Sequence, residues 1–181
     1  MALKTLFLAG LTLCSAASYG HAALNINDWS YATDPHGSKA HFHSLQNEAI
    51  AIDFERVPRV DKQNNSWVEL IYTLPKGDLS TSKSIEIHYQ SDQPLIVKLS
   101  QSDYGKDGDK SYAHYQALLP KALEWQSHTL TFEQFKRPTW TPDTSQDKGL
   151  NLANISAVYL VPSLTDEQGG KAKLAVKSIS L

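Results

Sequence analysis

Apolar and polar side chains alternate in short runs along most of this chain. In segment 84–91, three apolar residues share one parity and three polar residues share the other. The apolar set is Ile85, Ile87 and Tyr89, and the polar set is Glu86, His88 and Gln90. No stretch keeps a 3.6-residue apolar period across three turns, as an amphipathic helix would. The pattern therefore predicts an all-β protein.

Turn-forming residues separate these runs at intervals of about ten residues. Examples are Pro75-Lys76-Gly77 and Gly169-Gly170. We expect nine strands, near 40–45, 48–57, 67–74, 84–91, 94–101, 111–118, 125–132, 155–161 and 171–181. Such spacing is typical of an antiparallel β-sandwich of the jelly-roll type. A parallel α/β fold would need crossover helices, for which the turns leave no room.

The N-terminal segment has the pattern of an export signal. Lys4 supplies a positive charge, and the apolar run Leu6–Leu13 is too short to span a bilayer as a helix. Gly20-His21-Ala22 then predicts cleavage after Ala22. We expect a signal peptide at 1–22, a single domain at 23–181, and a secreted or periplasmic protein with no integral membrane segment after processing.

Composition narrows the chemistry further. The chain is 41% hydrophobic and 20% charged, which is typical of a globular protein. Its formal charge of -2 gives no basic footprint for nucleic acid. Cys14 and Met1 both lie in the expected signal, so the mature chain would have no thiol for catalysis, disulfides or zinc binding.

Several segments follow a known family pattern in the correct order. Trp125-Gln-Ser-His-Thr-Leu-Thr-Phe-Glu-Gln-Phe135 is followed by 152–160 and by the closing run 170–181. Upstream lie the strand 67–74, the corner Asp78-Leu79-Ser80 and the strand 85–89. Residues 67–181 thus resemble galactose-binding-like jelly rolls, and they are similar to family 11 carbohydrate-binding modules. Residues 24–66 fit through Asp28-Trp29 and an alternating strand at 48–57.

The chain departs from that family pattern at two places. Lys177-Ser178 stands where the last strand commonly carries acidic residues, which puts a structural calcium site in doubt. His128 stands where an inward aliphatic residue is expected, and we interpret it as a buried neutral histidine.

The resemblance implies that this exported protein binds polysaccharide without catalysis, and an open sheet face could hold the sugar chain. Aromatic rings stack on the apolar faces of sugars, and polar side chains bind their hydroxyl groups. Parity assigns this face the residues Trp67, Glu86, His88, Gln90, Lys98, Tyr115 and Tyr159. Tyr159 is the strongest candidate, because Val158 and Leu160 flank it and would face inward. Trp140, in a Pro-containing loop, lines a rim or plugs one end of the sandwich. Partners would be polysaccharide and a polysaccharide-degrading enzyme.

A metal-dependent enzyme of cupin or copper type is one alternative. His41 and His43 project from the same strand face, and Glu48 follows, so the three could share a metal. Cleavage after Gly20 would instead expose His21 as an N-terminal copper ligand.

Two acidic groups suggest other chemistry. Asp53 and Glu55 share a strand face, but paired catalytic carboxylates usually face each other across a cleft, so we interpret them as solvated flanks. The loop containing Asp103, Asp107, Gly108 and Asp109 lacks the full calcium-loop pattern, so we interpret it as a turn. A structural or adhesive domain that binds other proteins is a further alternative.

Overall fold

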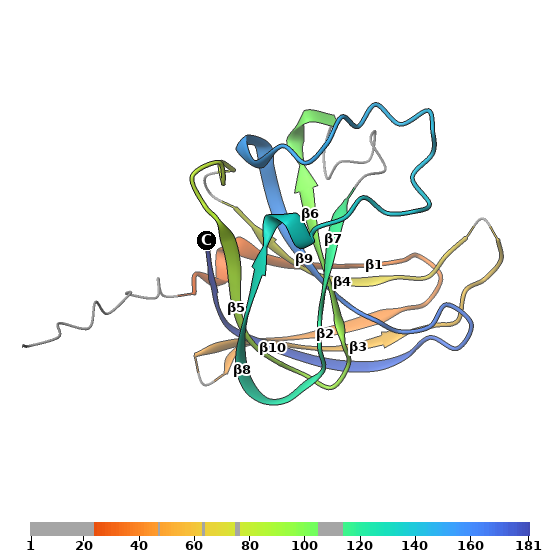
Figure 1. Cartoon of the computed structure of the whole chain (residues 1–181). Coiled ribbons are helices and arrows are strands. Elements are labelled where there is room, and N and C mark those ends of the chain that lie inside the picture. The colour runs from red at the N-terminus through yellow and green to blue at the C-terminus, as the bar shows by residue number, and fades with distance from the viewer. Residues whose placement is uncertain (1–23, 47, 63, 75–76, 105–113) are drawn as a thin grey trace, which may run out of the picture.

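Two antiparallel sheets pack face to face (Figure 1). The computed structural model describes residues 24–46, 48–62, 64–74, 77–104 and 114–181. Within them, ten strands form two five-stranded sheets, ordered β1-β4-β9-β6-β7 in sheet A and β2-β3-β10-β5-β8 in sheet B. The strands are β1 (Trp29–Thr33), β2 (Lys39–Gln46), β3 (Ala49–Arg56), β4 (Val68–Thr73), β5 (Ser84–Ser91), β6 (Leu95–Gln101), β7 (Tyr115–Leu119), β8 (Ala122–Thr131), β9 (Ile155–Pro162) and β10 (Gly170–Ser180).

The core fills the space between the two sheets, and the predicted alternation produces it. On β5, Ile85, Ile87 and Tyr89 have no exposed surface, while the residues between them are partly exposed. On β6, Leu95, Val97 and Leu99 are equally buried. Because successive side chains of a strand point to opposite faces, one face of each sheet closes the core and the other remains outside. The outer faces are where a ligand could bind.

Short 3-10 helices connect several strands. They are η1 (Ile26–Asp28), η2 (Ser102–Tyr104), η4 (Phe132–Gln134) and η5 (Leu152–Asn154). The side chain of Asn25 caps η1, and that of Asn151 caps η5, as expected for a residue that satisfies free N–H groups. Among the described residues, no helix has the length and apolar character needed to cross a membrane.

The structure confirms the all-β jelly-roll prediction and adds one strand to the nine expected. The missed strand is β1, whose five residues alternate poorly between apolar and polar. β7 begins at Tyr115 rather than at 111, and residues 111–113 lie outside the described part of the chain. The expected signal peptide at 1–22 and the loop residues Asp107, Gly108 and Asp109 also lie outside it.

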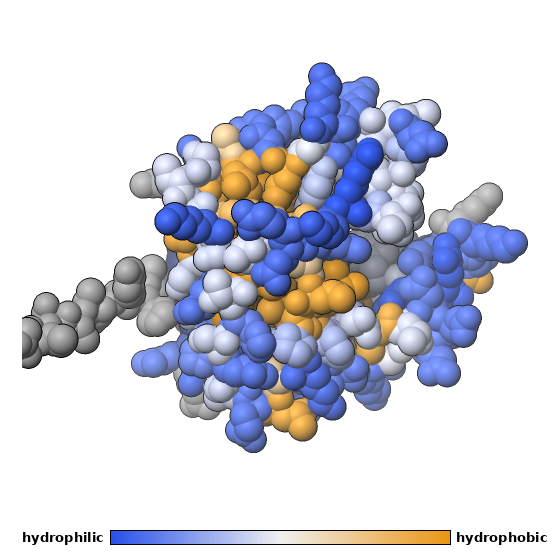
Figure 2. Space-filling view, in the orientation of Figure 1, coloured by the Kyte–Doolittle hydropathy of each residue, from blue (hydrophilic) through white to orange (hydrophobic). Residues whose placement is uncertain are grey.

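On the face seen in Figure 2, polar side chains surround several patches of apolar side chains. Several large apolar residues are exposed within the described chain, including Leu118, Leu123, Trp140 and Trp67. Isolated apolar residues on a surface are ordinary. The two tryptophans are different, because they border the same cleft.

Candidate functional site

The residues predicted to share one binding face lie on two different sheets. Lys98 on β6 and Tyr159 on β9 belong to sheet A, and Trp67 immediately precedes its strand β4. Glu86 and His88 are on β5, in sheet B. The outer faces of the two sheets point away from each other, so these residues cannot form the single platform expected from the sequence.

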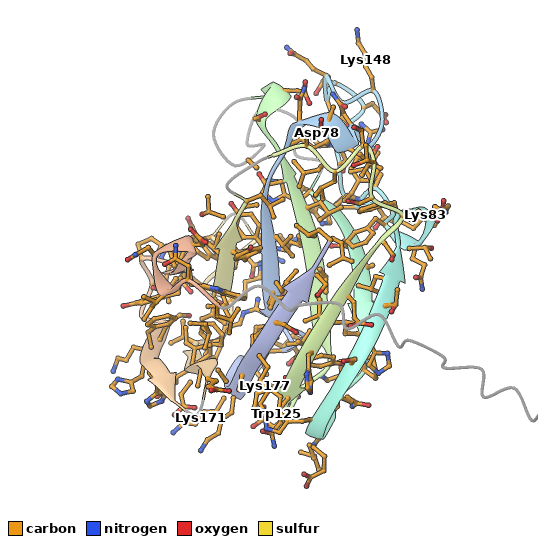
Figure 3. The ribbon with its side chains drawn as sticks, turned by 90° about the vertical axis from the view of Figure 1, so that its left-hand side faces the viewer. Asp78, Lys83, Trp125, Lys148, Lys171 and Lys177 are labelled. Carbon is orange, nitrogen blue, oxygen red and sulfur yellow. The ribbon has the colours of Figure 1, made fainter. Side chains whose placement is uncertain are left out.

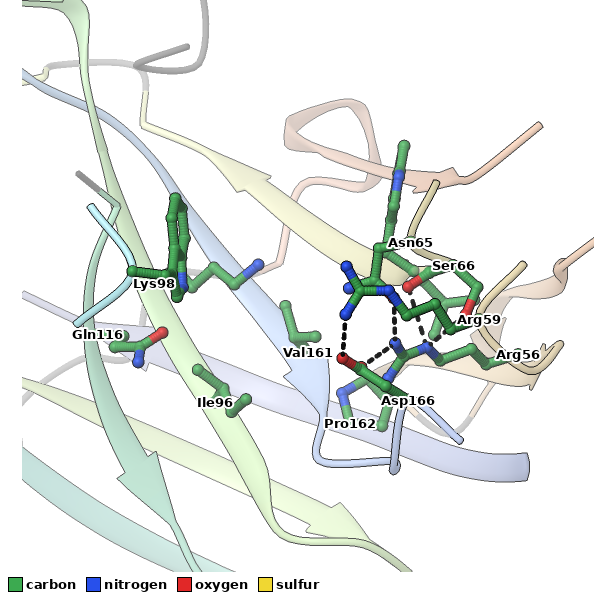
Figure 4. A pocket seen from close by; sticks show the side chains of 13 residues that line it. Arg56, Arg59, Asn65, Ser66, Ile96, Lys98, Gln116, Val161, Pro162 and Asp166 are labelled. Atoms are coloured by element: carbon green, nitrogen blue, oxygen red, sulfur yellow. Dashed lines mark hydrogen bonds and ion pairs between the residues drawn. The ribbon is translucent and has the colours of Figure 1, made fainter. Parts of the chain in front are cut away.

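A cleft of about 760 Å³ opens on the outer face of sheet A (Figure 4). Two exposed tryptophans line it, Trp67 at 38% and Trp140 at 63% of their full exposure. The complete lining is Arg56, Arg59, Asn65, Ser66, Trp67, Val68, Ile96, Lys98, Gln116, Trp140, Val161, Pro162 and Asp166. The cleft thus combines aromatic and aliphatic surface with polar groups, which is the composition of a site for a sugar.

Arg56 at the end of β3 holds one wall of this cleft. Its Nε donates to the carbonyl oxygen and the hydroxyl of Ser66, each at 3.1 Å. Its Nη1 donates to the Leu164 carbonyl at 2.8 Å, and its Nη2 donates to Asn65 Oδ1 at 3.3 Å and Asp166 Oδ1 at 2.5 Å. The Arg56 side chain is only 9% exposed. One guanidinium therefore joins the segment before β4 to the loop between β9 and β10.

Gly169 allows that loop to approach Arg56. Its φ of +61° lies in the left-handed region, and a Cβ built on it would overlap the backbone of Arg56 and Val57. The Gly169 amide donates to the Thr165 carbonyl at 2.9 Å, which closes the turn that carries Asp166. A side chain at this position would push Asp166 away from Arg56.

Asp34, in the loop after β1, positions the backbone of Trp67. The Trp67 amide donates to Asp34 Oδ2 at 2.8 Å, and the Asp34 amide donates to the Trp67 carbonyl at 3.1 Å. The His36 amide donates to the other carboxylate oxygen at 2.6 Å. Burial of the carboxyl opposes its ionisation, but hydrogen bonds from Ser38, Trp67 and His36 outweigh it, so the pKa of Asp34 is lowered. Trp67 is thus fixed by a charged group that does not itself line the cleft.

Lys98 forms an ion pair beside the cleft. Its Nζ lies 2.7 Å from Glu69 Oε1 on β4, and both side chains are mostly buried, at 22% and 14% exposure. β9 runs between these two strands, so the pair spans one intervening strand. Glu69 balances the positive charge of Lys98. The Lys98 ammonium group has further N–H donors, so it can also donate to a ligand oxygen.

Tyr159 lies on the outer face of sheet A but is covered. It pairs with Lys98 on one side and Ile71 on the other, and both point outward. Its side chain is only 3% exposed, and the ring of His114 stacks on it with centroids 5.6 Å apart. The predicted direction is therefore confirmed, and the predicted exposure is wrong. The sequence could not show that a preceding segment folds over this ring.

Tyr115 faces the core, contrary to the prediction. It pairs with Leu99, which is fully buried, so the two share the inner face of sheet A. Its hydroxyl donates to Asp147 Oδ2 at 2.9 Å, and Arg137 Nε lies 3.2 Å from the same oxygen. These contacts attach the long segment between η4 and η5 to the sandwich, which gives Tyr115 a structural role.

Glu86, His88 and Gln90 line up on the outer face of sheet B, as their parity predicts. His88 meets Trp125 edge to face with ring centroids 5.6 Å apart. Gln90 Nε2 donates to the Leu123 carbonyl.

His128 lies opposite the buried Ile87 on the inner face, but it is only partly buried, with its ring 5.9 Å from that of Tyr89. The prediction of an inward direction is confirmed, whereas full burial is not.

The candidate metal ligands do not converge. His41 and His43 share a face, with ring centroids 4.4 Å apart, and His43 Nε2 lies 3.1 Å from Asp53 Oδ2. Glu48 is in the turn between β2 and β3 with a φ of 62°. Among the residues that the structure describes, no three His, Cys, Asp or Glu side chains are arranged so that they could hold a metal ion. Asp53 is 44% exposed, which agrees with its interpretation as a solvated residue, and it has His43 as a partner.

Sequence reasoning missed most of the polar cleft residues. Arg59, Asn65, Gln116 and Asp166 come from loops or edge strands, where parity carries little information. The available signal was the cluster 56–67, which combines two arginines, two asparagines and a tryptophan in a polar stretch. Segment 163–169, which contains Asp166, has a turn pattern and no feature that would have predicted its place in the cleft.

No family model and no curated protein sequence matches the chain. Solved structures do match its fold. The family 11 carbohydrate-binding module of the cellulosomal cellulase Lic26A-Cel5E of Clostridium thermocellum superposes with a TM-score of 0.61 over 88% of this chain and 95% of the module, at 15% identity. The chain has the fold of a family 11 carbohydrate-binding module.

Two further structures agree with that result. A family 11 module from Clostridium thermocellum in complex with a β-1,3-1,4-mixed-linked tetrasaccharide has a TM-score of 0.59 at 14% identity, over 85% of this chain and 91% of the module. The agarase AgWH50C matches 88% of this chain with 23% of its own length, at a TM-score of 0.53 and 10% identity. At such low identities, the likeness to the family 11 module establishes the fold and leaves the ligand to be argued from the cleft.

Proposed function

We propose that this protein binds a polysaccharide chain in the cleft on sheet A and does not cleave it. The observation that carries the proposal is the pair of exposed tryptophans, Trp67 and Trp140, beside a wall of hydrogen-bonding groups. Indole rings supply flat apolar surface for sugar faces, and Asn65, Gln116 and Arg59 supply donors and acceptors for hydroxyl groups. The family 11 fold, present in modules named for carbohydrate binding, supports the same ligand class.

The acids near the cleft support binding without hydrolysis. Glycoside hydrolysis generally needs two carboxyl groups that flank the bond to be cleaved. Among the described residues that line the cleft, Asp166 is the one carboxylate, and it is bound by Arg56 and approached by Arg59 at 3.6 Å. Glu69, nearby, is paired with Lys98. We also propose that the protein acts after export, because residues 1–22 have the pattern of a signal peptide.

The test is native affinity electrophoresis in gels that contain mixed-linkage β-glucan, xylan, mannan or agarose. We expect at least one polymer to retard the protein. Trp67→Ala and Trp140→Ala should each weaken that binding about 10-fold or more, since exposed aromatic anchors carry much of a binding energy. The matched control is Trp125→Ala, which removes a tryptophan on sheet B and should leave retardation unchanged. Equal mobility in every gel would overturn the proposal.

A further inference from the structure

Trp140 lies on a loop whose two ends are joined by an ion pair. The loop begins at Arg137 and ends at Asp147, and Arg137 Nε lies 3.2 Å from Asp147 Oδ2. The Asp147 side chain is only 2% exposed, whereas Trp140 is 63% exposed. Compact surface loops whose ends meet are frequently functional. We refer to residues 137–147 as the Trp140 loop.

Two turns shape this loop between its ends. The Thr141 amide donates to the Pro138 carbonyl at 3.1 Å, so Trp140 occupies the third position of a four-residue turn. The Ser145 amide donates to the Pro142 carbonyl at 2.9 Å in a second turn. Because the proline ring fixes φ, each turn begins at a residue with restricted backbone freedom. Hydrogen bonds and prolines therefore limit the loop to few conformations.

Strand β7 attaches the base of the Trp140 loop to the cleft. Gln116, which lines the cleft, exchanges two backbone hydrogen bonds with Lys136, at 2.9 and 2.8 Å, just before the loop. The neighbouring Tyr115 donates from its hydroxyl to Asp147 Oδ2 at 2.9 Å, at the other end of the loop. The Gly149 amide donates to Asp147 Oδ1 at 3.3 Å. The Asp147 carboxylate thus joins the strand, the first residue of the loop and the segment that follows it.

We propose that Asp147 is a positioning residue, which holds Trp140 in place for binding in the cleft; this inference rests on the function proposed above. Asp147 is not among the described residues that line the cleft, so it acts through the loop, whose ends its carboxylate joins to β7. A loop that is already ordered loses little conformational freedom when a sugar chain binds. Trp140 therefore has its binding position before the ligand arrives, and loss of the carboxylate releases the loop and displaces the indole.

Fluorine NMR of the mature protein labelled with 5-fluorotryptophan observes the loop without any ligand. The Trp140 resonance is assigned from its absence in Trp140→Phe, and the Trp125 resonance serves as an internal reference. Lys148, which follows Asp147, lies at the opposite end of the sandwich from Trp125 (Figure 3), so the reference should not sense a change in the loop. We expect Asp147→Ala to move the Trp140 resonance toward that of the free amino acid. Asp143→Ala, the matched change at an exposed residue of the same loop, should leave it in place.

Binding by the same variants tests the link to the cleft. The probe is whichever of mixed-linkage β-glucan, xylan, mannan or agarose retards the wild type in native gels. Asp147→Ala should weaken this binding about 5-fold or more, and Asp143→Ala should leave it within about 2-fold of the wild type. In the Trp140→Ala background, Asp147→Ala should change binding by less than about 2-fold, because a residue that acts through Trp140 then has nothing left to position. A general loss of structure would instead weaken binding in both backgrounds.

Tyr115→Phe removes one donor from Asp147 and keeps the ring, so it should move both readouts in the same direction by a smaller amount. It takes the place of Asp147→Ala if circular dichroism shows that variant to be unfolded. The inference is overturned if the Trp140 resonance keeps its wild-type position in the folded variants, or if the loss of binding adds to that of Trp140→Ala. Failure of every polymer to retard the wild type would overturn the proposed function and with it the binding role, whereas the fluorine spectra would still decide whether Asp147 holds Trp140.

Discussion

The rings of His114 and Tyr159 stack on the outer face of sheet A, with centroids 5.6 Å apart and planes inclined by 27°. His114 immediately precedes β7, and Tyr159 lies in β9, with β6 between these two strands. The contact therefore closes one part of the sheet face across a neighbouring strand. The cleft opens elsewhere on that face, over Ile96 and Val161.

Replacing Tyr159 with alanine should destabilise the fold. The side chain is 3% exposed, and removing a buried aromatic ring leaves a cavity, so we expect a loss of about 2–4 kcal/mol in the free energy of unfolding. Urea denaturation measures it. The companion variant His114→Ala removes the covering ring and should cost less, about 1 kcal/mol. A Tyr159→Ala protein as stable as the wild type would show that the ring is not packed.

Arg56 and Arg59 should differ sharply when each is changed to lysine. Arg56 is nearly buried and donates to four residues, so Arg56→Lys should cost about 2–4 kcal/mol in unfolding free energy and weaken polymer binding in the cleft. Arg59 is more exposed and donates to carbonyls of its own turn at Asp61 and Lys62. Arg59→Lys should cost less than about 1 kcal/mol. Denaturant melts of both proteins give the comparison, and equal losses would contradict the structural role of Arg56.

Asp34 should make stability depend on pH in the acid range. Its pKa is lowered in the folded state from the ordinary value of 3.8, so the carboxylate stabilises the fold above that value, and this contribution is lost as the pH falls through the folded-state pKa. Asp34→Asn should cost about 1–3 kcal/mol at pH 7, because one backbone donor loses its acceptor.

Urea melts of the wild type and Asp34→Asn at pH 7 and at pH 3 test this dependence. The difference in unfolding free energy should narrow at pH 3, since this is below the ordinary pKa of 3.8 and the carboxyl of the unfolded chain is then mostly protonated. A constant difference at both values would mean that the ionised form of Asp34 gains nothing from its partners. Binding by the cleft should weaken in the variant, as Trp67 loses its anchor.

Tyr89 should make stability depend on pH in the alkaline range, where its contribution is lost as the pH rises. Burial raises its pKa to about 12, and its hydroxyl donates to the Pro120 carbonyl at 2.7 Å. Its contribution to stability is therefore complete below pH 10, the usual tyrosine pKa, and is lost as the pH rises toward 12. Tyr89→Phe should be less stable by about 1 kcal/mol at pH 8, and the difference should shrink above pH 10. Parallel stability profiles of the two proteins would contradict this.

Alternation along the chain was sufficient to predict most of the fold. Period-2 runs identified nine strands and, in segment 84–91, the inward residues Ile85, Ile87 and Tyr89, because burial on one face of a sheet imposes that period. β1 escaped because Tyr31, although apolar, is exposed at the sheet edge, where it stacks on Phe42. Edge strands have weaker patterns, since fewer of their residues are buried.

The site was less predictable for a physical reason. Parity tells which side of its own strand a residue faces, but it does not tell which sheet the strand joins, so Glu86 and His88 were grouped with Lys98. Tyr115 was assigned outward, although it shares its parity with Ala117 and Leu119, which are buried. The wall of the cleft depends on Arg56 reaching Asp166, which is 110 residues away, and no local pattern encodes such a contact.

The long-range contacts of Arg56 also bear on the order in which parts of the protein fold. Its partners Leu164 and Asp166 stand 108 and 110 residues later in the chain, and β10, the central strand of sheet B, comes last. Contacts of high sequence separation form slowly, because a long loop must close before they bring any gain. A chain that has emerged only as far as β8 would lack Leu164 and Asp166, so the wall of the cleft that Arg56 holds could not yet form. The wall of the cleft would then be complete only when the segment from β9 to β10 joins the sandwich, so on the proposed function a partly folded chain would not yet bind polysaccharide.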